Sequence, residues 1–363
     1  PPRNDDEPDL PRLVSSVQRK CDISDARHAG DYGLCTFLLK MREYYRWENE
    51  LPLGHALPKD DLGDWLTSRE RRWLGLDGED FAPLPMAGSE IDPFEAGAAN
   101  RHLLPRGLVY GAGYGLFRKP VFFLGRLLRA EERAGLTVLV SSCEYARELA
   151  GPPAMLQGNT IYVREESARR YLWEKVEEWQ WQRQDNAMAR ALAAYDCLAD
   201  PGAAPQRMAE DQMETMILHE VGEGMAGKML GEPWRELLDA VACTPGETAL
   251  RAARDLLADC LCTLPGLLGR ADRRALHLYF ATFDGPRRRL FPQALEAYER
   301  LVQDGAPEPL EEVARDGKVR WLSTARELLA LPPSQREAAA TELLHASPAD
   351  GPRLRRPESA PGS

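Results

Sequence analysis

The sequence predicts an α+β protein that is predominantly α-helical, with a small, mostly antiparallel sheet followed by a helical lobe. Two observations lead to this fold class. Short runs rich in Val, Phe, Leu and Thr, separated by turns that contain glycine, are concentrated between residues 107 and 164. From residue 165 onward, apolar residues recur at the spacing of three and four that is typical of amphipathic helices. A chain of 363 residues, 44% of them hydrophobic, can also bury a substantial core.

The part of the chain before the sheet is expected to contain little regular structure. Residues 1–20 are expected to form a disordered N-terminus, which starts with an acidic, proline-rich stretch. Residues 21–106 contain one clear helical pattern, over 31–50, where apolar residues recur every three or four positions. Thr67 and Glu70 have the spacing of a capping box, which predicts one short helix around Thr67–Leu74. The rest of residues 52–106 is dense in Pro, Gly and Asp, so we expect an ordered loop that wraps the core, with a linker as the alternative.

The segment 107–164 is predicted to form the sheet as a small subdomain. A charged turn ending at Gly135 predicts a hairpin, and Gly158-Asn159 predicts a second turn. A short helix is expected over Glu144–Leu149, before Gly151-Pro152-Pro153. The predicted strands are Leu108–Tyr110, Val121–Leu128, Leu136–Ser141 and Thr160–Val163.

The helical lobe is expected to cover residues 165–346. It should start with one long helix over 166–198 that carries three tryptophans, and a second helix should cover 209–230. A third helix starts at Thr244, because Thr244 and Glu247 have the spacing of a capping box around a first-turn proline. The last segment, 347–363, is rich in Pro, Arg, Gly and Ser and is expected to be a disordered tail.

Charge and cysteine usage narrow the classes of partner. The net charge of −11 disfavours contact with phosphate backbones and anionic lipids, so we expect neither a nucleic-acid nor a membrane partner. No stretch approaches 18 consecutive apolar residues. Seven cysteines, an odd number at scattered positions, are typical of a reduced, cytoplasmic protein. The sequence gives no indication of oligomeric state.

One segment could carry chemistry. On a helix over 209–230, His219 and Glu223 are four residues apart and share a face, with Glu220 beside them. Most of the other side chains are apolar, so this helix should be largely buried. Because an unpaired buried carboxylate is very costly, the polar face needs a partner such as a metal ion, an arginine or a bound substrate.

The residues His219-Glu220-Val221-Gly222-Glu223 resemble the HExxH signature of zincin metallopeptidases, with Glu in place of the second His. The resemblance implies that His219 and Glu223 bind a divalent metal, zinc in the first place and iron as the alternative, and that Glu220 is the catalytic base. A third ligand stays open between Asp255, Asp259 and His277.

A second pattern overlaps the first. Residues 222–229 resemble the phosphate-binding loop GxxxxGK[ST], with Met229 in place of the Ser or Thr. Such a loop must follow a strand, whereas the zincin signature lies on a helix. The two interpretations of this segment therefore exclude one another.

Three functions follow from these patterns. The first is a metal-dependent, peptidase-like hydrolase that acts on a peptide or a small molecule. The second is a non-catalytic scaffold that binds partners through its helical lobe, and the third is a degenerate nucleotide-binding loop. The chain as a whole also resembles a bacterial family, although no single motif defines it.

Overall fold

The chain folds into two compact units that differ in secondary structure. Unit 1 comprises the chain up to Gln184 together with Pro205–Met213, and unit 2 comprises Asp185–Ala204 and the chain from Glu214 onward. Unit 1 contains every strand of the described residues and unit 2 only helices, so the predicted α+β class with a predominance of helix is confirmed. The computed structural model describes residues 9–86, 89–197, 199 and 204–345.

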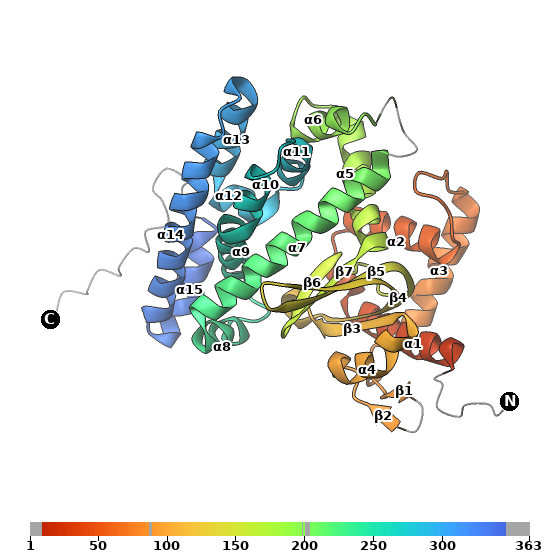
Figure 1. Cartoon of the computed structure of the whole chain (residues 1–363). Helices are drawn as coiled ribbons and strands as arrows, with labels where there is room; N and C mark the ends of the chain where they lie inside the picture. The colour runs from red at the N-terminus through yellow and green to blue at the C-terminus, as the bar shows by residue number, and fades with distance from the viewer. Residues whose placement is uncertain (1–8, 87–88, 198, 200–203, 346–363) are drawn as a thin grey trace. The chain divides into compact units, whose positions relative to one another are not determined.

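A five-stranded sheet forms the centre of unit 1 (Figure 1). Its strands, in the spatial order β3-β4-β5-β7-β6, are β3 (Leu108–Tyr114), β4 (Pro120–Arg133), β5 (Leu136–Arg147), β7 (Thr160–Arg164) and β6 (Ala154–Gln157). β5 and β7 are parallel and the other three pairings are antiparallel, which confirms a mostly antiparallel sheet. β1 (Leu84–Met86) and β2 (Ser89–Ile91) form a separate antiparallel pair.

The hairpin predicted at Gly135 is confirmed. Arg133 pairs with Leu136 across a turn of two residues, Ala134 and Gly135. Both have positive φ, 52° and 76°, as in the type I′ turns whose twist matches that of paired strands.

The helices of unit 1 surround this sheet. The short helix expected around Thr67–Leu74 overlaps α3, which starts earlier, whereas α4 and the β1–β2 pair lie in the segment predicted as wrapping loop. The helices of this unit are α1 (Leu10–His28), η1 (Ala29–Asp31), α2 (Leu34–Glu48), α3 (Lys59–Trp73), α4 (Ala96–Leu103), η2 (Leu104–Arg106), η3 (Leu116–Arg118), α5 (Glu165–Gln182) and the Pro205–Met213 part of α7 (Ala204–Leu230).

The prediction of disorder is wrong for residues 10–20, which form the first half of α1. Leu13, Val17 and Cys21 recur every four residues along this helix and are fully buried. They join the core built by the strands, because α1 packs on β4 and β5. The remaining N-terminal residues, 1–8, lie outside the described part of the chain.

Two predicted helices differ in the structure. The one expected over Glu144–Leu149 is mostly strand, because Ala146 pairs with Leu124 of β4 and the pairing extends β5. The long helix expected over 166–198 is divided into α5 and α6 (Ala187–Ala194). α6 starts where the side chain of Asn186 accepts hydrogen bonds from two backbone N–H groups, a preferred N-cap arrangement.

Charged side chains are buried inside unit 1 in paired groups. Glu144 accepts hydrogen bonds from Arg164 Nη2 at 2.7 Å and from the Ser167 hydroxyl at 2.6 Å. On α1, Asp25 accepts a hydrogen bond from Lys119 Nζ at 3.2 Å. Since a buried ion without a partner costs several kcal/mol, such pairs allow charged segments to pack in the interior.

Unit 2 is a helical lobe centred on α9, which packs against α8, α12, α14 and α15. Its core includes the fully buried Trp321 and Tyr298. Its helices are α6, the part of α7 (Ala204–Leu230) from Glu214 onward, α8 (Glu232–Ala240), α9 (Pro245–Ala258), η4 (Asp259–Thr263), α10 (Leu264–Leu268), α11 (Arg274–Ala281), α12 (Gly285–Leu290), α13 (Pro292–Asp304), α14 (Glu308–Ala330) and α15 (Pro333–Leu343).

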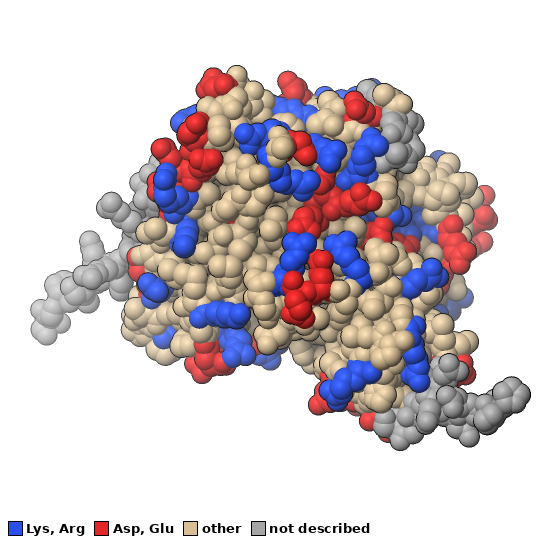
Figure 2. All heavy atoms as spheres, viewed as in Figure 1, with Lys and Arg blue, Asp and Glu red and all other residues tan. Residues whose placement is uncertain are grey.

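The surface carries charges of both signs. Figure 2 shows acidic and basic side chains interspersed over one face of the molecule, without a continuous basic area. Across the described residues, no helix combines the length and the apolar character needed to cross a bilayer. The tail predicted over 347–363 lies outside the described residues.

Candidate functional site

The segment singled out by its sequence lies in the second half of α7. This helix runs without interruption from Ala204 to Leu230, so His219 and Glu223 lie one turn apart on it. The predicted phosphate loop is wrong, because residues 222–229 lie inside the helix and no strand precedes them.

A close contact between α7 and α9 builds the site. A Cβ atom at Gly222 would lie 2.5 Å from the carbonyl oxygen of Ala258, so any larger residue would force the two helices apart. Directly after Ala258, the chain continues as a π-helical turn, η4, and such turns are frequent at functional sites. The contact brings His219 and Glu223 next to Asp255 of α9 and Asp259 of η4.

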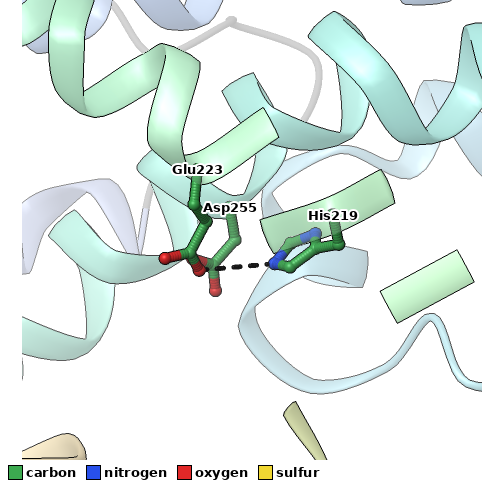
Figure 3. Close-up of side chains that lie close together, drawn as sticks. All are labelled: His219, Glu223 and Asp255. Atoms are coloured by element: carbon green, nitrogen blue, oxygen red, sulfur yellow. Dashed lines mark ion pairs between the residues drawn. The ribbon is translucent and has the colours of Figure 1, made fainter. Parts of the chain in front are cut away.

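The imidazole of His219 lies between carboxylates of both segments. Its Nδ1 is 2.8 Å from Asp259 Oδ1, and its Nε2 is 3.4 Å from Glu223 Oε1. His219, Glu223 and Asp255 each offer one ligand atom, and these three atoms lie within 4.8 Å of one another. Figure 3 shows the ring pointing toward the two carboxylates. Their side chains are 18%, 14% and 26% exposed, so solvent reaches the group.

Two arginines pair with these acids. Arg254 Nη2 is 2.8 Å from Glu223 Oε2 and 3.3 Å from Asp255 Oδ1, and Arg287 Nη1 is 3.1 Å from Asp259 Oδ2. Burial acts to raise the pKa of Glu223, but Arg254 and His219 outweigh it and lower that pKa to about 2. In the same way, His219 and Arg287 outweigh burial and lower the pKa of Asp259 to about 2.

The pKa values of His219 and Glu220 are raised, in contrast to those of Glu223 and Asp259. Burial acts to lower the pKa of His219, but the charges of Asp259 and Glu223 raise it well above its ordinary value. Burial and the neighbouring charge of Glu223 raise the pKa of Glu220 to about 8. The pKa values of Glu220 and Glu223 are therefore pushed apart, a pattern that often assigns acid and base roles.

The structure separates the candidates for the third ligand. Asp255 joins His219 and Glu223, whereas Asp259 binds the opposite nitrogen of the imidazole. His277 is not part of the group, since its Nδ1 lies 2.9 Å from the hydroxyl of Tyr298.

The sequence did not reveal the two arginines. Arg254 precedes Asp255 on α9, but an adjacent Arg–Asp pair is ordinary on an exposed helix. Arg287 begins a run of three arginines beside a proline, and such a run is more often solvated surface than part of a site. Only tertiary packing, of α7 on α9 for Arg254 and of α12 on the α9–η4 segment for Arg287, shows that both face the acids.

The donor set of this cluster fits a divalent ion. One imidazole nitrogen and two carboxylate oxygens supply three protein ligands, the number found in catalytic zinc sites, with one carboxylate more than the set of two histidines and one glutamate in some metallopeptidases. Histidines that bind metals commonly donate their other N–H to a carboxylate, and Asp259 occupies that position on His219. The same contacts also form a set of ion pairs that is complete without an ion.

The chain thus combines an N-terminal α+β unit with a helical unit that carries a histidine–carboxylate cluster. The N-terminal domain of a family of unknown function, DUF6866, matches residues 12–164, and the C-terminal domain of that family matches residues 169–348. The chain therefore belongs to the DUF6866 family, and the cluster falls within its C-terminal domain. No curated protein and no solved structure matches the chain.

Proposed function

We propose that this protein is a metal-dependent hydrolase whose ion is held by His219, Glu223 and Asp255, with zinc as the first candidate and iron as the second. One observation carries the proposal. Three potential ligand atoms from two helices lie within 4.8 Å of one another, and a carboxylate occupies the second nitrogen of the histidine.

The neighbouring residues suit hydrolysis. A divalent ion at this place would polarise a substrate carbonyl and promote deprotonation of water. Glu220 is assigned as the general base on the resemblance to the zincin signature, and a cation beside it would lower its raised pKa of about 8 and favour the ionised form that accepts a proton. In that role Glu220 would take the proton of the attacking water and deliver it to the leaving nitrogen or oxygen. The substrate would be a peptide or a small molecule with an amide or ester bond.

Metal binding is the direct test. The purified protein is reconstituted with zinc or iron, dialysed and analysed for metal content, and zinc affinity is measured by calorimetry. We expect about one ion per chain, lost in the double variant His219→Ala, Glu223→Ala. His277→Ala is the matched control, because it removes a half-buried histidine of the same unit that has no contact with the cluster.

Two results would overturn the proposal. The first is that the wild-type protein retains neither zinc nor iron after reconstitution. The second is that the double variant binds the metal as tightly as the wild type does. Circular dichroism of each variant establishes that a loss of binding is not a loss of fold.

A non-catalytic scaffold is the second candidate. It is supported by the pairing of every charged group in the cluster: His219 lies between two acids, and Arg254 and Arg287 each contact a carboxylate. In this case the cluster holds α7 against α9, and the double variant would lose stability while the wild type binds no metal.

We further propose that the protein acts in the cytoplasm without a nucleic-acid or membrane partner. The odd number and scattered positions of its seven cysteines, and its net charge of −11, support this assignment.

A further inference from the structure

Arg254 is the charged group that the proposed metal centre leaves incompletely paired. Its Nη2 contacts both Glu223 and Asp255, which are the two carboxylates assigned to the ion. Its Nε is buried and has no hydrogen-bond partner among the described residues. The side chain is nevertheless 20% exposed, so solvent reaches part of it.

An ion at this centre would compete with Arg254 for the same negative charge. The guanidinium stays charged under all ordinary conditions, and a partly buried cation that loses its partners is strongly destabilised. The planar fork of an arginine matches the oxygen spacing of carboxylate and phosphate groups, which it binds through two parallel hydrogen bonds. A substrate oxyanion beside the ion would therefore restore the missing partner.

Arg287 is less suited than Arg254 to binding a substrate oxyanion. Its Nη1 contacts Asp259, which lies on the far side of the imidazole from the ligand atoms, and its Nη2 donates to the carbonyl oxygen of Thr282. An ion bound at His219 Nε2 leaves these contacts in place, so Arg254 alone of the two arginines would lose partners.

We propose that the substrate carries an oxyanion, a carboxylate or a phosphate-like group, which binds the guanidinium of Arg254 next to the metal-held reacting bond. This inference rests on the proposed metal centre and narrows its substrates from peptides and small molecules in general to anionic ones.

The test measures anion binding to the metal-loaded full-length protein. Acetate and inorganic sulfate are titrated separately into zinc-loaded and zinc-free protein by calorimetry, which distinguishes planar from tetrahedral oxyanions. We expect at least one of them to bind the zinc-loaded protein more tightly than the zinc-free protein. Arg254→Lys keeps the positive charge but loses the planar fork, so it should weaken the binding of that anion on the order of tenfold. Arg251→Lys is the matched control, because Arg251 lies on the same helix and pairs with Glu247 away from the cluster.

The outcomes separate the two proposals. If the wild type binds no metal, the proposed function fails. If zinc binds but neither anion does, or if Arg254→Lys binds the anion as tightly as the wild type and Arg251→Lys, the anion site is refuted while the metal centre stands. Zinc affinity of Arg254→Lys is measured in parallel, and we expect it to be retained, which shows that the variant is folded.

Discussion

Replacing the buried Glu144 with glutamine removes one charge from the interior of unit 1. This carboxylate is fully buried and accepts hydrogen bonds from Arg164 and Ser167. Burial acts to raise its pKa, but Arg164 and Arg147 outweigh it and lower the pKa from 4.5 to about 2. Each pKa unit corresponds to about 1.4 kcal/mol, so the ionised form contributes on the order of 3 kcal/mol to the free energy of unfolding.

The sign of this contribution makes a sharp prediction. Because the folded-state pKa is depressed, the stabilisation is complete above the ordinary pKa of 4.5 and is lost as the pH falls toward 2. We expect Glu144→Gln to lower the free energy of unfolding by about 3 kcal/mol at pH 7, and the difference from wild type to shrink between pH 4.5 and pH 2.

Urea denaturation followed by circular dichroism over this pH range measures both quantities. Glu79→Gln is the control, because Glu79 is 38% exposed and pairs with an exposed Arg19, so its loss should cost less than about 1 kcal/mol. A difference between Glu144→Gln and wild type that stays constant from pH 7 to pH 2 would refute the assigned role of the buried charge.

Three further predictions concern other parts of the chain. Gly222→Ala should destabilise unit 2 by about 1–3 kcal/mol and weaken zinc binding, because the added Cβ meets the backbone of Ala258. Gly227→Ala on the same helix has open space around its Cβ and should stabilise the protein by up to about 1 kcal/mol, so equal effects of the two variants in urea denaturation would contradict this prediction. Lys20 is buried, and its Nζ hydrogen-bonds only Ser16 among the described residues. Burial lowers its pKa from 10.5 to about 8, so Lys20→Met should stabilise the protein at pH 7 by up to about 3 kcal/mol and by less near pH 10; destabilisation at pH 7 would count against this prediction. Chelation of zinc-loaded protein should lower the melting temperature, because an ion at 100 times its Kd adds about 2.7 kcal/mol to the free energy of unfolding, and the His219→Ala, Glu223→Ala variant should not respond to chelator.

The fold class was predictable because its signals are local. Alternating apolar runs and the glycine turn at Gly135 mark the sheet, and helical spacing marks the lobe. α1 was missed for a reason that is not local. Its sequence contains Asp22 and Asp25, which suggest a solvated segment, yet both carboxylates are buried. The partner of Asp25 is Lys119, which comes from a distant part of the chain. Charge therefore predicts exposure only where tertiary structure supplies no counter-charge.

The candidate site was half predictable for a related reason. His219, Glu220 and Glu223 belong to one helix, so their spacing alone places them on neighbouring positions. The positions of Asp255 and Asp259 around the imidazole depend on two further features. These are the contact at Gly222 and the π-helical turn that begins at Asp259. No pattern within either segment predicts how α7 and the α9–η4 segment are aligned with one another.

The glycine at position 222 shows how one residue supports two different interpretations. In the sequence it opened a pattern that resembles a phosphate loop, where glycine lets the backbone approach a phosphate. In the structure its missing Cβ lets the backbone of α9 approach instead, with Ala258 in contact. The physical requirement, close approach to a backbone without a side chain, is the same in both cases. The consequence differs, because the approach of α9 is what brings Asp255 and Arg254 to Glu223, and the candidate site consists of these contacts.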